Sequence, residues 1–329
     1  MNIYVGTDIS KLHFDSFIEG KVYRFGNDKS GHLNFIKRLP EGSWVVMECT
    51  GTYGHRLAET LVDHGFLVSM VNALQVKRFA QSRFKRAKTD KADAKLLTEY
   101  AQSLEQCHDE RDRLRLWIPE KSSQVFLKQL RTIYEMLVHV RTMMTNQLEA
   151  LEGYPKVSPM ARQTLQSLLK TLNIKINAIE DAMNTIVDDN YPDESKNLES
   201  IPGIGRKSAV VIIAAVGDIQ RFSDAKAFAA FAGLAPRVNE SGSSIRGRGI
   251  LSHYGVTWLR SQLYMCAMSA LRWNKQCKEL YARLIAKGKS KKSAILAVAH
   301  KLIRQIYAVL ANKTSFDVDY NITKITLVG

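Results

Sequence analysis

The chain has 329 residues, of which 47 are Lys or Arg and 32 are Asp or Glu, so its formal net charge is +15. This length suggests about two domains, and a hydrophobic fraction of 45% is enough for a packed core. Four widely spaced cysteines exclude a disulfide framework and a CxxC zinc site. No secretory signal or long apolar run is visible, so we expect a cytoplasmic, nucleoid-associated protein without a membrane span. The charge surplus favours nucleic acid as the partner.

The first third of the chain, residues 1–118, is expected to form a mixed sheet. Three β-rich segments joined by tight turns predict an antiparallel meander, after which helical and strand patterns alternate. The order βββαβαβα is the ribonuclease H-like arrangement, in which parallel strands are joined through helices. The expected strands are 3–8, 12–18, 22–25, 44–47 and 66–71, and the expected helices are 31–37, 56–62 and one that begins near Asp90.

The middle segment, residues 119–192, has apolar residues at alternating steps of four and three. This 3.5-residue period predicts a coiled-coil helical hairpin, broken at Gly153–Pro159. An ordinary hairpin packed on its own domain is the alternative, and in both cases the segment is a spacer or assembly handle. The repeat consists of Phe126, Leu130, Ile133, Leu137, Val140, Met144, Leu165, Leu169, Leu172, Ile176, Ile179, Met183 and Ile186.

Four acids stand where strands end or a helix begins. Asp8 closes the first strand and Glu48 the fourth, and these strands are neighbours in a ribonuclease H-like sheet. Asp90 and Asp93 share one face of the last helix. Crowded carboxylates repel one another unless cations neutralise them, and hard oxygen ligands suit Mg²⁺ or Mn²⁺. We therefore predict a divalent metal site for phosphoryl transfer, although each acid alone is also explained as a turn or helix-terminus residue.

The segment around Asp90 is strongly basic, with Asp90 and Asp93 as its only acids between Lys77 and Lys95. Cations beside metal-binding acids would clamp a phosphodiester, whereas a solvated basic face is the ordinary interpretation. Of the interleaved Phe79 and Phe84, at least one is expected in the core. The predicted nucleic-acid contacts of this segment are Lys77, Arg78, Arg83, Lys85, Arg86 and Lys88.

Two motifs lie in the last region, residues 193–329, which we expect to be mostly helical. The first, Ile201–Lys207, is a Gly-x-Gly turn that enters a helix and resembles a helix–hairpin–helix element that binds phosphate. The second is a flexible basic loop in which Ser241 could be an exposed nucleophile, although no base is placed by the sequence. The predicted nucleic-acid contacts of the two motifs are Gly203, Gly205, Arg206, Lys207, Arg237, Arg246 and Arg248.

Five motifs in series resemble the DEDD insertion-sequence transposases that include the Piv/MooV invertases. They are Val5–Lys11, Met47–Tyr53, Lys88–Ala94, Ile201–Gly205 and Glu240–Gly247, and the resemblance that they carry extends over most of the chain. The resemblance implies a RuvC-like nuclease domain, a coiled-coil linker and a C-terminal transposase domain. It implies metal binding by Asp8, Glu48, Asp90 and Asp93, and a nucleophilic Ser241, with Ser243 and Ser244 as alternatives. Cys49 stands where the family often has alanine, which is a harmless change.

The resemblance also implies a DNA recombinase that cuts and rejoins strands through a transient phosphoserine link. Members of the family are similar in working as multimers, many with a structured bridge RNA that selects donor and target DNA. The expected partners are therefore DNA, a guide RNA and other copies of the chain, as a dimer or tetramer, so that acids and serine could meet across protomers. The alternative enzyme is a structure-selective nuclease of the junction-resolvase type. A non-catalytic nucleic-acid-binding protein and an actin-like sugar kinase are weaker alternatives.

Overall fold

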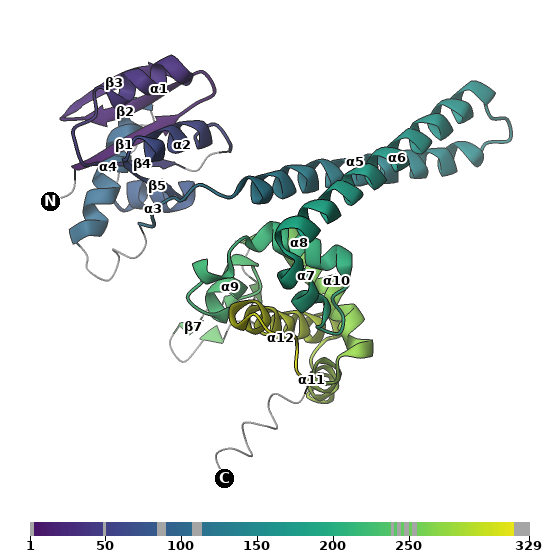
Figure 1. Cartoon of the computed structure of the whole chain (residues 1–329). Coiled ribbons are helices and arrows are strands. Elements are labelled where there is room, and N and C mark those ends of the chain that lie inside the picture. Colours follow the sequence, from purple (N-terminus) through teal and green to yellow (C-terminus); the bar gives the residue numbers. More distant parts are fainter. Residues whose placement is uncertain are drawn as a thin grey trace, which may run out of the picture. The chain divides into compact units, whose positions relative to one another are not determined.

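The computed structural model describes residues 3–48, 51–83, 90–106, 114–237, 240–241, 245–246, 250–251 and 255–318. Side chains at 90–92, 236–237, 240–241, 245–246 and 250–251 are outside this description. The chain divides into two compact units, Met1–Pro119 and Glu120–Gly329, which are labelled by element in Figure 1. A further division of the second unit into a hairpin domain and a C-terminal domain stays a prediction.

The first unit contains a five-stranded mixed sheet in the order β3-β2-β1-β4-β5. The first three strands form an antiparallel meander, whereas β4 runs parallel to both β1 and β5. The mixed sheet with its helical crossovers confirms the α/β part of the predicted fold, and the RuvC-like assignment stays a prediction. The elements are β1 (Ile3–Ile9), β2 (His13–Ile18), β3 (Lys21–Gly26), α1 (Lys29–Ile36), β4 (Ser43–Glu48), α2 (His55–Asp63), β5 (Leu67–Val71), α3 (Ala73–Ser82) and α4 (Asp90–Gln106).

The two faces of this sheet are covered by different helices. Val5 and Val45 pack in one apolar cluster with residues of α1 and α2. Tyr4 and Val46 pack in another cluster with residues of α3 and α4. Because side chains alternate along a strand, the even-numbered residues of β1 and β4 point to the face that α3 and α4 cover.

Gly6 permits a very close approach between β1 and α4. Its N–H donates a hydrogen bond of 2.7 Å to Oγ1 of Thr98. A Cβ added at Gly6 would lie 2.5 Å from the backbone nitrogen of Thr98 and would overlap the carbonyl oxygen of Ala94. The absence of a side chain at this position therefore fixes the spacing between the central strand and the helix that begins at Asp90.

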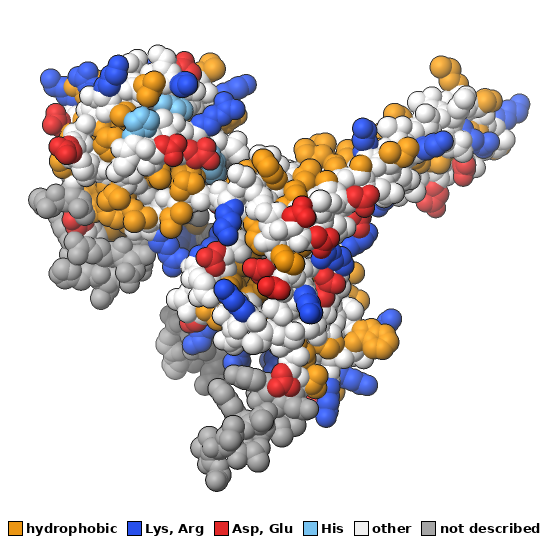
Figure 2. Space-filling model, in the orientation of Figure 1, with side chains coloured by type: hydrophobic (Ala, Val, Ile, Leu, Met, Phe, Trp, Pro, Cys, Tyr) orange, Lys and Arg blue, Asp and Glu red, His pale blue; other side chains and the backbone are white. Residues whose placement is uncertain are grey.

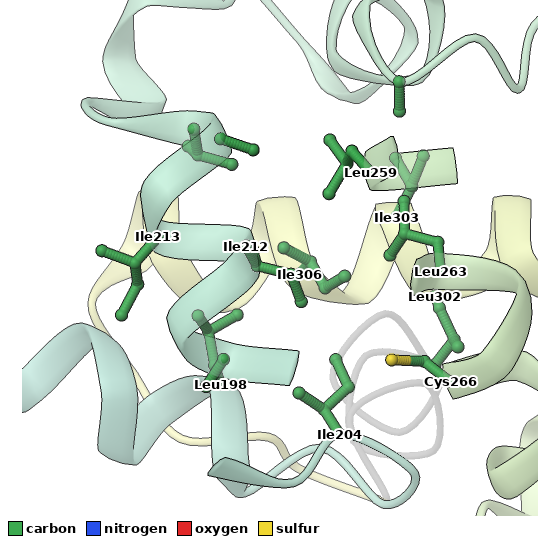
Figure 3. Close-up of a cluster of buried hydrophobic side chains, with 14 of the residues drawn as sticks. Leu198, Ile204, Ile212, Ile213, Leu259, Leu263, Cys266, Leu302, Ile303 and Ile306 are labelled. Atoms are coloured by element: carbon green, nitrogen blue, oxygen red, sulfur yellow. The ribbon is translucent and has the colours of Figure 1, made fainter. Parts of the chain in front are cut away.

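The second unit is helical and is built around an apolar core. Leu198, Ile212, Leu263 and Ile306 come from four different helices and are buried in this core, part of which Figure 3 shows. The elements are α5 (Ser122–Glu152), α6 (Pro159–Asn190), α7 (Pro192–Glu199), α8 (Arg206–Val216), a 3-10 turn (Ile219–Arg221), α9 (Ala225–Phe231), β6 (Pro236–Arg237), β7 (Glu240–Ser241), β8 (Ile245–Arg246), β9 (Ile250–Leu251), α10 (Thr257–Trp273), α11 (Lys275–Ala286) and α12 (Lys291–Asn312).

Helices α5 and α6 form the predicted hairpin and lie along each other (Figure 1). In α6, the buried Ile176 and Met183 lie in the predicted seam. In α5, Phe126 and Ile133 of the predicted seam are 53% and 44% exposed, whereas the neighbouring Leu127 is buried. The coiled-coil assignment of the hairpin stays a prediction.

The base of the hairpin is joined to the core of the second unit. Nε2 of Gln124 donates hydrogen bonds to the carbonyl oxygens of Ile213 and Ala214, at 2.9 and 2.8 Å. The guanidinium carbon of the buried Arg131 lies 3.5 Å from the ring centroid of Trp258. These contacts satisfy carbonyls at the end of α8 and tie α5 to α8 and α10.

One described helix, α12, is long and apolar enough to cross a membrane by length and composition. Its residues Val298, Leu302, Ile303 and Ile306 are fully buried in the core of the second unit. We therefore regard α12 as a core helix of this unit.

Candidate active site

Asp8 and Glu48 occupy matching positions on two neighbouring parallel strands. The register pairs Gly6 with Val46 and Thr7 with Met47, so Asp8 comes level with Glu48. Both residues are even-numbered and therefore lie on the face covered by α3 and α4. Both are partly exposed. Because adjacent strands are about 4.8 Å apart, these two predicted site residues are neighbours at the carboxyl end of the parallel strands.

Helix α4 begins toward the same end of the sheet. Ala94 and Thr98 lie against Gly6, and Tyr4, earlier in β1, belongs to a cluster that includes Tyr100 and Leu104, later in α4. The helix therefore runs opposite to β1. From Gly6 to Asp8 the strand advances by two residues, or about 6 Å, and from Ala94 back to Asp90 the helix advances by four residues, which is also about 6 Å. The first turn of α4, which contains Asp90 and Asp93, therefore comes to the level of Asp8.

The metal site itself stays a prediction. Among the described side chains, no three His, Cys, Asp or Glu residues form a group that could hold a metal ion. Asp8, Glu48 and Asp93 therefore do not make a complete set of ligands without Asp90, of which the structure describes the backbone. The donor types fit a hard cation, because carboxylates from two strands and a facing helix offer oxygen ligands alone.

An acid that sequence analysis missed lies in the same row across the sheet. Asp15 of β2 is the register partner of Asp8, and Arg24 of β3 is the register partner of Asp15. Asp15 is only 2% exposed. Arg24 donates from Nε to Oδ1 of Asp15 at 2.9 Å and from Nη2 to Oδ2 at 2.7 Å. The signal was present in the sequence, since an acid inside an apolar strand requires a cationic partner.

The basic segment before α4 is only partly described. Lys77, Arg78 and Arg83 are exposed, and their contact with nucleic acid stays a prediction. Phe79 packs edge-on against Tyr100 with 5.3 Å between ring centroids, which confirms that one aromatic of the segment packs against the core. The remaining residues of this group, Phe84, Lys85, Arg86 and Lys88, lie outside the described residues.

The Ile201–Gly205 turn leads into α8 as predicted, with Gly205 as the residue before the helix. Gly203 has a φ of +108°, and an added Cβ would lie 2.7 Å from Cβ of Ala270. The glycine at 203 is therefore required by backbone conformation and by packing against α10.

The two cations after this turn bind acids of the protein itself. Nη2 of Arg206 lies 2.5 Å from Oδ1 of Asp188, and Nη1 donates to Oγ of Ser195 at 2.6 Å. Nζ of Lys207 lies 2.8 Å from Oε1 of Glu180, and this hydrogen bond raises the pKa of Lys207. For Arg206 and Lys207 to contact phosphate as predicted, they would have to exchange these ion pairs with acids of the protein for contacts with the phosphate. In the structure, the pairs join α8 to α6 and α7.

Ser241 lies in a pair of nested β-ladders. The outer ladder pairs β6 with β9, and the inner ladder pairs β7 with β8, in which Ser241 is opposite Ile245. The predicted flexible loop thus contains short antiparallel strands, and Ser241 is the last residue of β7. Arg237 and Arg246 lie in these strands. Gly242, Ser243, Ser244 and Arg248 fall outside the described residues.

The described cysteines behave as core residues. Cys266 and Cys277 are both buried and have free thiols, as predicted. Burial raises the pKa of both, and that of Cys277 reaches about 11. Neither thiol is therefore a candidate nucleophile or metal ligand at neutral pH. Cys49 and Cys107 lie in parts of the chain that the structure does not describe.

Comparison with known proteins matches both units. Residues 5–152 match the DEDD transposases of the IS110 type, and residues 195–282 match the transposases of the IS116/IS110/IS902 family. The pilin gene-inverting protein of Moraxella bovis is 30% identical over 95% of this chain and 97% of its own. The transposase for insertion sequence element IS1111A of Coxiella burnetii is 26% identical over 95% and 90%. A probable family 20 transposase of Pseudomonas aeruginosa is 25% identical over 95% and 98%.

Proposed function

We propose that this chain, which belongs to the IS116/IS110/IS902 family of transposases, cuts and rejoins DNA with a carboxylate-held divalent cation and a serine nucleophile. Membership of the family makes DNA the substrate and strand cleavage the reaction. The observation that carries the proposal is the β1–β4 register, which makes Asp8 and Glu48 neighbours near the start of α4. The antiparallel meander followed by parallel strands supports a RuvC-like fold for the first unit.

In this proposal Asp8, Glu48, Asp90 and Asp93 hold Mg²⁺, or Mn²⁺ in its place. When bound, the cation would stabilise negative charge on the scissile phosphate. The hydroxyl oxygen of Ser241 forms a bond to the phosphorus, and the bond to the leaving deoxyribose oxygen breaks. Serine loses the proton that the leaving oxygen gains, so the step balances. Attack by a hydroxyl of the second strand then reverses the chemistry and frees the serine.

A covalent link explains how cut strands are rejoined without an added energy source. A phosphoserine diester keeps one ester bond for each one broken, whereas attack by water would leave the strands cut. The relative from Moraxella bovis is named for inverting a gene, an outcome that requires rejoining. This comparison favours a recombinase over the junction-resolvase type of nuclease.

We propose further partners for the same reaction. The net charge of +15 supports a structured guide RNA in addition to DNA, because neutralising two polyanions requires many cations. Since the acids and Ser241 lie in different units, we also propose a homo-oligomer, assembled through the hairpin of α5 and α6. The reaction would take place in the cytoplasm, on DNA of the nucleoid.

The proposal is tested with a nicked suicide duplex made from the DNA that flanks the gene, with and without RNA transcribed from that DNA. The wild-type chain should form a covalent protein–DNA adduct that requires Mg²⁺ or Mn²⁺ and increases with the RNA. Ser241→Ala should form no adduct. Asp8→Asn should lower the rate of adduct formation at least about 100-fold, because the cation supplies several kcal/mol to the transition state.

Two controls make the result specific. Ser243→Ala and Ser244→Ala are the matched control variants for the identity of the nucleophile. If one of them forms no adduct whereas Ser241→Ala still does, the nucleophile is that other serine. Asp8→Asn should retain DNA affinity within about twofold. Cleavage that continues in Ser241→Ala without any adduct would replace the recombinase by a nuclease that uses water.

A further inference from the structure

A basic corner formed by the C-terminal end of α10, by α11 and α12, and by the turn between these last two helices carries most of the net charge of the chain. Between Arg272 and Arg304 there are ten Lys or Arg residues and one acid, Glu279, so this segment has a net charge of +9 out of +15. The ten cations are Arg272, Lys275, Lys278, Arg283, Lys287, Lys289, Lys291, Lys292, Lys301 and Arg304.

These cations are available to an external partner. All of them except Lys301 are exposed. Within the part of the chain that the structure describes, none has an acid within ion-pair distance, in contrast to Arg24, Arg206 and Lys207. In Figure 2, Lys and Arg side chains border the end of the second unit where Figure 1 labels α11.

The fold concentrates four of the lysines at one end of a helical pair. Helices α11 and α12 pack together and are joined by a short turn in which Gly288 has a φ of +75°. Lys287 and Lys289 lie in this turn, and Lys291 and Lys292 open α12. The turn residues and the first helical turn are thus one compact group of positive charges.

The position of Lys291 and Lys292 opposes the electrostatics of their own helix. They occupy the first turn of α12, which has no acidic residue and is capped by Ser290. The N-terminal end of a helix is positive and favours anions, so lysines there destabilise the helix unless an anion approaches. The positive potential of the helix N-terminus and that of the four lysines therefore add up at the start of α12.

We propose that the basic corner binds the phosphate backbone of double-stranded DNA, independently of base sequence. The 12 residues of α11 extend about 18 Å, a length over which duplex DNA presents roughly ten phosphate charges. Flexible lysines on a turn suit phosphate contacts, which position a duplex but do not specify its sequence. The proposal rests on the DNA substrate of the family and is independent of the metal site and of Ser241.

The test compares two variants of the full chain with equal loss of charge. The first replaces Lys287, Lys289, Lys291 and Lys292 by Gln. The control replaces Lys21, Lys37, Lys170 and Lys175, four exposed lysines on other elements, by Gln. Fluorescence anisotropy with a 30-base-pair duplex of arbitrary sequence (about three helical turns) gives the affinity as a function of salt concentration.

We expect the corner variant to bind duplex DNA at least tenfold more weakly than wild type at about 0.1 M salt. The slope of log K against log[salt] should fall by up to about 3.6, which is about 0.9 for each phosphate that the variant no longer neutralises. The control variant should change affinity less than about threefold. An equal loss in both variants, or no loss in the corner variant, would overturn the proposal, as would a loss confined to a structured RNA hairpin used as a second probe.

Further measurements distinguish a failure of the DNA-binding proposal from misfolding of the variant and from a failure of the catalytic proposal. The urea midpoint of unfolding of the corner variant should be equal to that of wild type or higher, because the variant removes cations from the positive end of α12. Ser241→Ala should bind the duplex with an unchanged salt slope. The corner variant should still form the covalent adduct at protein concentrations above its weakened dissociation constant; an adduct lost even there, with the fold intact, would contradict a role limited to backbone binding.

Discussion

Asp15 shows how one buried charge can be built into the sheet beside the candidate active site. Both of its carboxylate oxygens accept hydrogen bonds from Arg24, in a side-on arrangement that compensates the desolvation of the acid. Because both of its oxygens accept from Arg24, Asp15 is better suited to a structural role in the sheet than to binding a metal ion. The row Arg24, Asp15, Asp8 and Glu48 thus has one cation at its edge and carboxylates toward α4.

Replacing Arg24 by Gln should leave Asp15 as a buried carboxylate without its guanidinium. Removal of one partner of a buried pair costs about 3–5 kcal/mol, and because the Arg24 side chain is 54% exposed we expect about 2 kcal/mol. The double variant Asp15→Asn/Arg24→Gln should lose less, since no buried charge remains. Urea unfolding of the three proteins measures both effects; equal stability of wild type and Arg24→Gln would contradict this interpretation.

At the scale of elements, the strands and crossovers of the first unit could be predicted from the sequence because their signals are local. The alternation in β2, the apolar run in β4 and the turn between β2 and β3 are each contained within a few consecutive residues. Once the order βββαβαβα is recognised, the neighbourhood of Asp8 and Glu48 follows from topology. Their exact level follows from the register, which no local pattern contains.

The features that local patterns miss at this scale depend on contacts between residues of different elements. The burial of Arg131, a cation, has no local signal, because its partner Trp258 is 127 positions later in the chain. Arg206 resembles a phosphate-binding residue in the sequence because its acid, Asp188, belongs to the preceding long helix. The strand pattern signals that Asp15 needs a cationic partner, but only the β2–β3 register identifies that partner as Arg24. A charged residue shows its role only when its tertiary partner is known.

At the scale of the whole molecule, the residues of the proposed reaction belong to two different compact units. Asp8, Glu48, Asp90 and Asp93 belong to Met1–Pro119, whereas Ser241 belongs to Glu120–Gly329. A proposed oligomer therefore offers two ways to complete the site, with acids and serine from one protomer or from two. The arrangement in which two protomers contribute would make cleavage dependent on assembly, which protects DNA from cutting by an isolated chain.

We expect that the acids of one protomer act with the serine of another, which mixing experiments can test. Asp8→Asn keeps its serine, Ser241→Ala keeps its acids, and neither should form an adduct alone. In randomly mixed dimers, half of the assemblies are heterodimers, and each would contain one composite site with both functions intact. Adduct should then return to about a quarter of the wild-type amount, because one in four of all sites is complete.

The identity of the labelled chain makes the result decisive. If the two variants carry tags of different mass, the adduct should be found only on the Asp8→Asn chain, since that chain supplies the attacking hydroxyl. If acids and serine of the same chain act together, every site in the heterodimer lacks one of them and no adduct returns at any mixing ratio. Exchange of protomers must be allowed before DNA is added, and a mixture of wild type with the doubly substituted Asp8→Asn/Ser241→Ala chain gives the calibration. In that mixture a heterodimer has no complete composite site, whereas a site completed within one chain would remain active in the wild-type protomer.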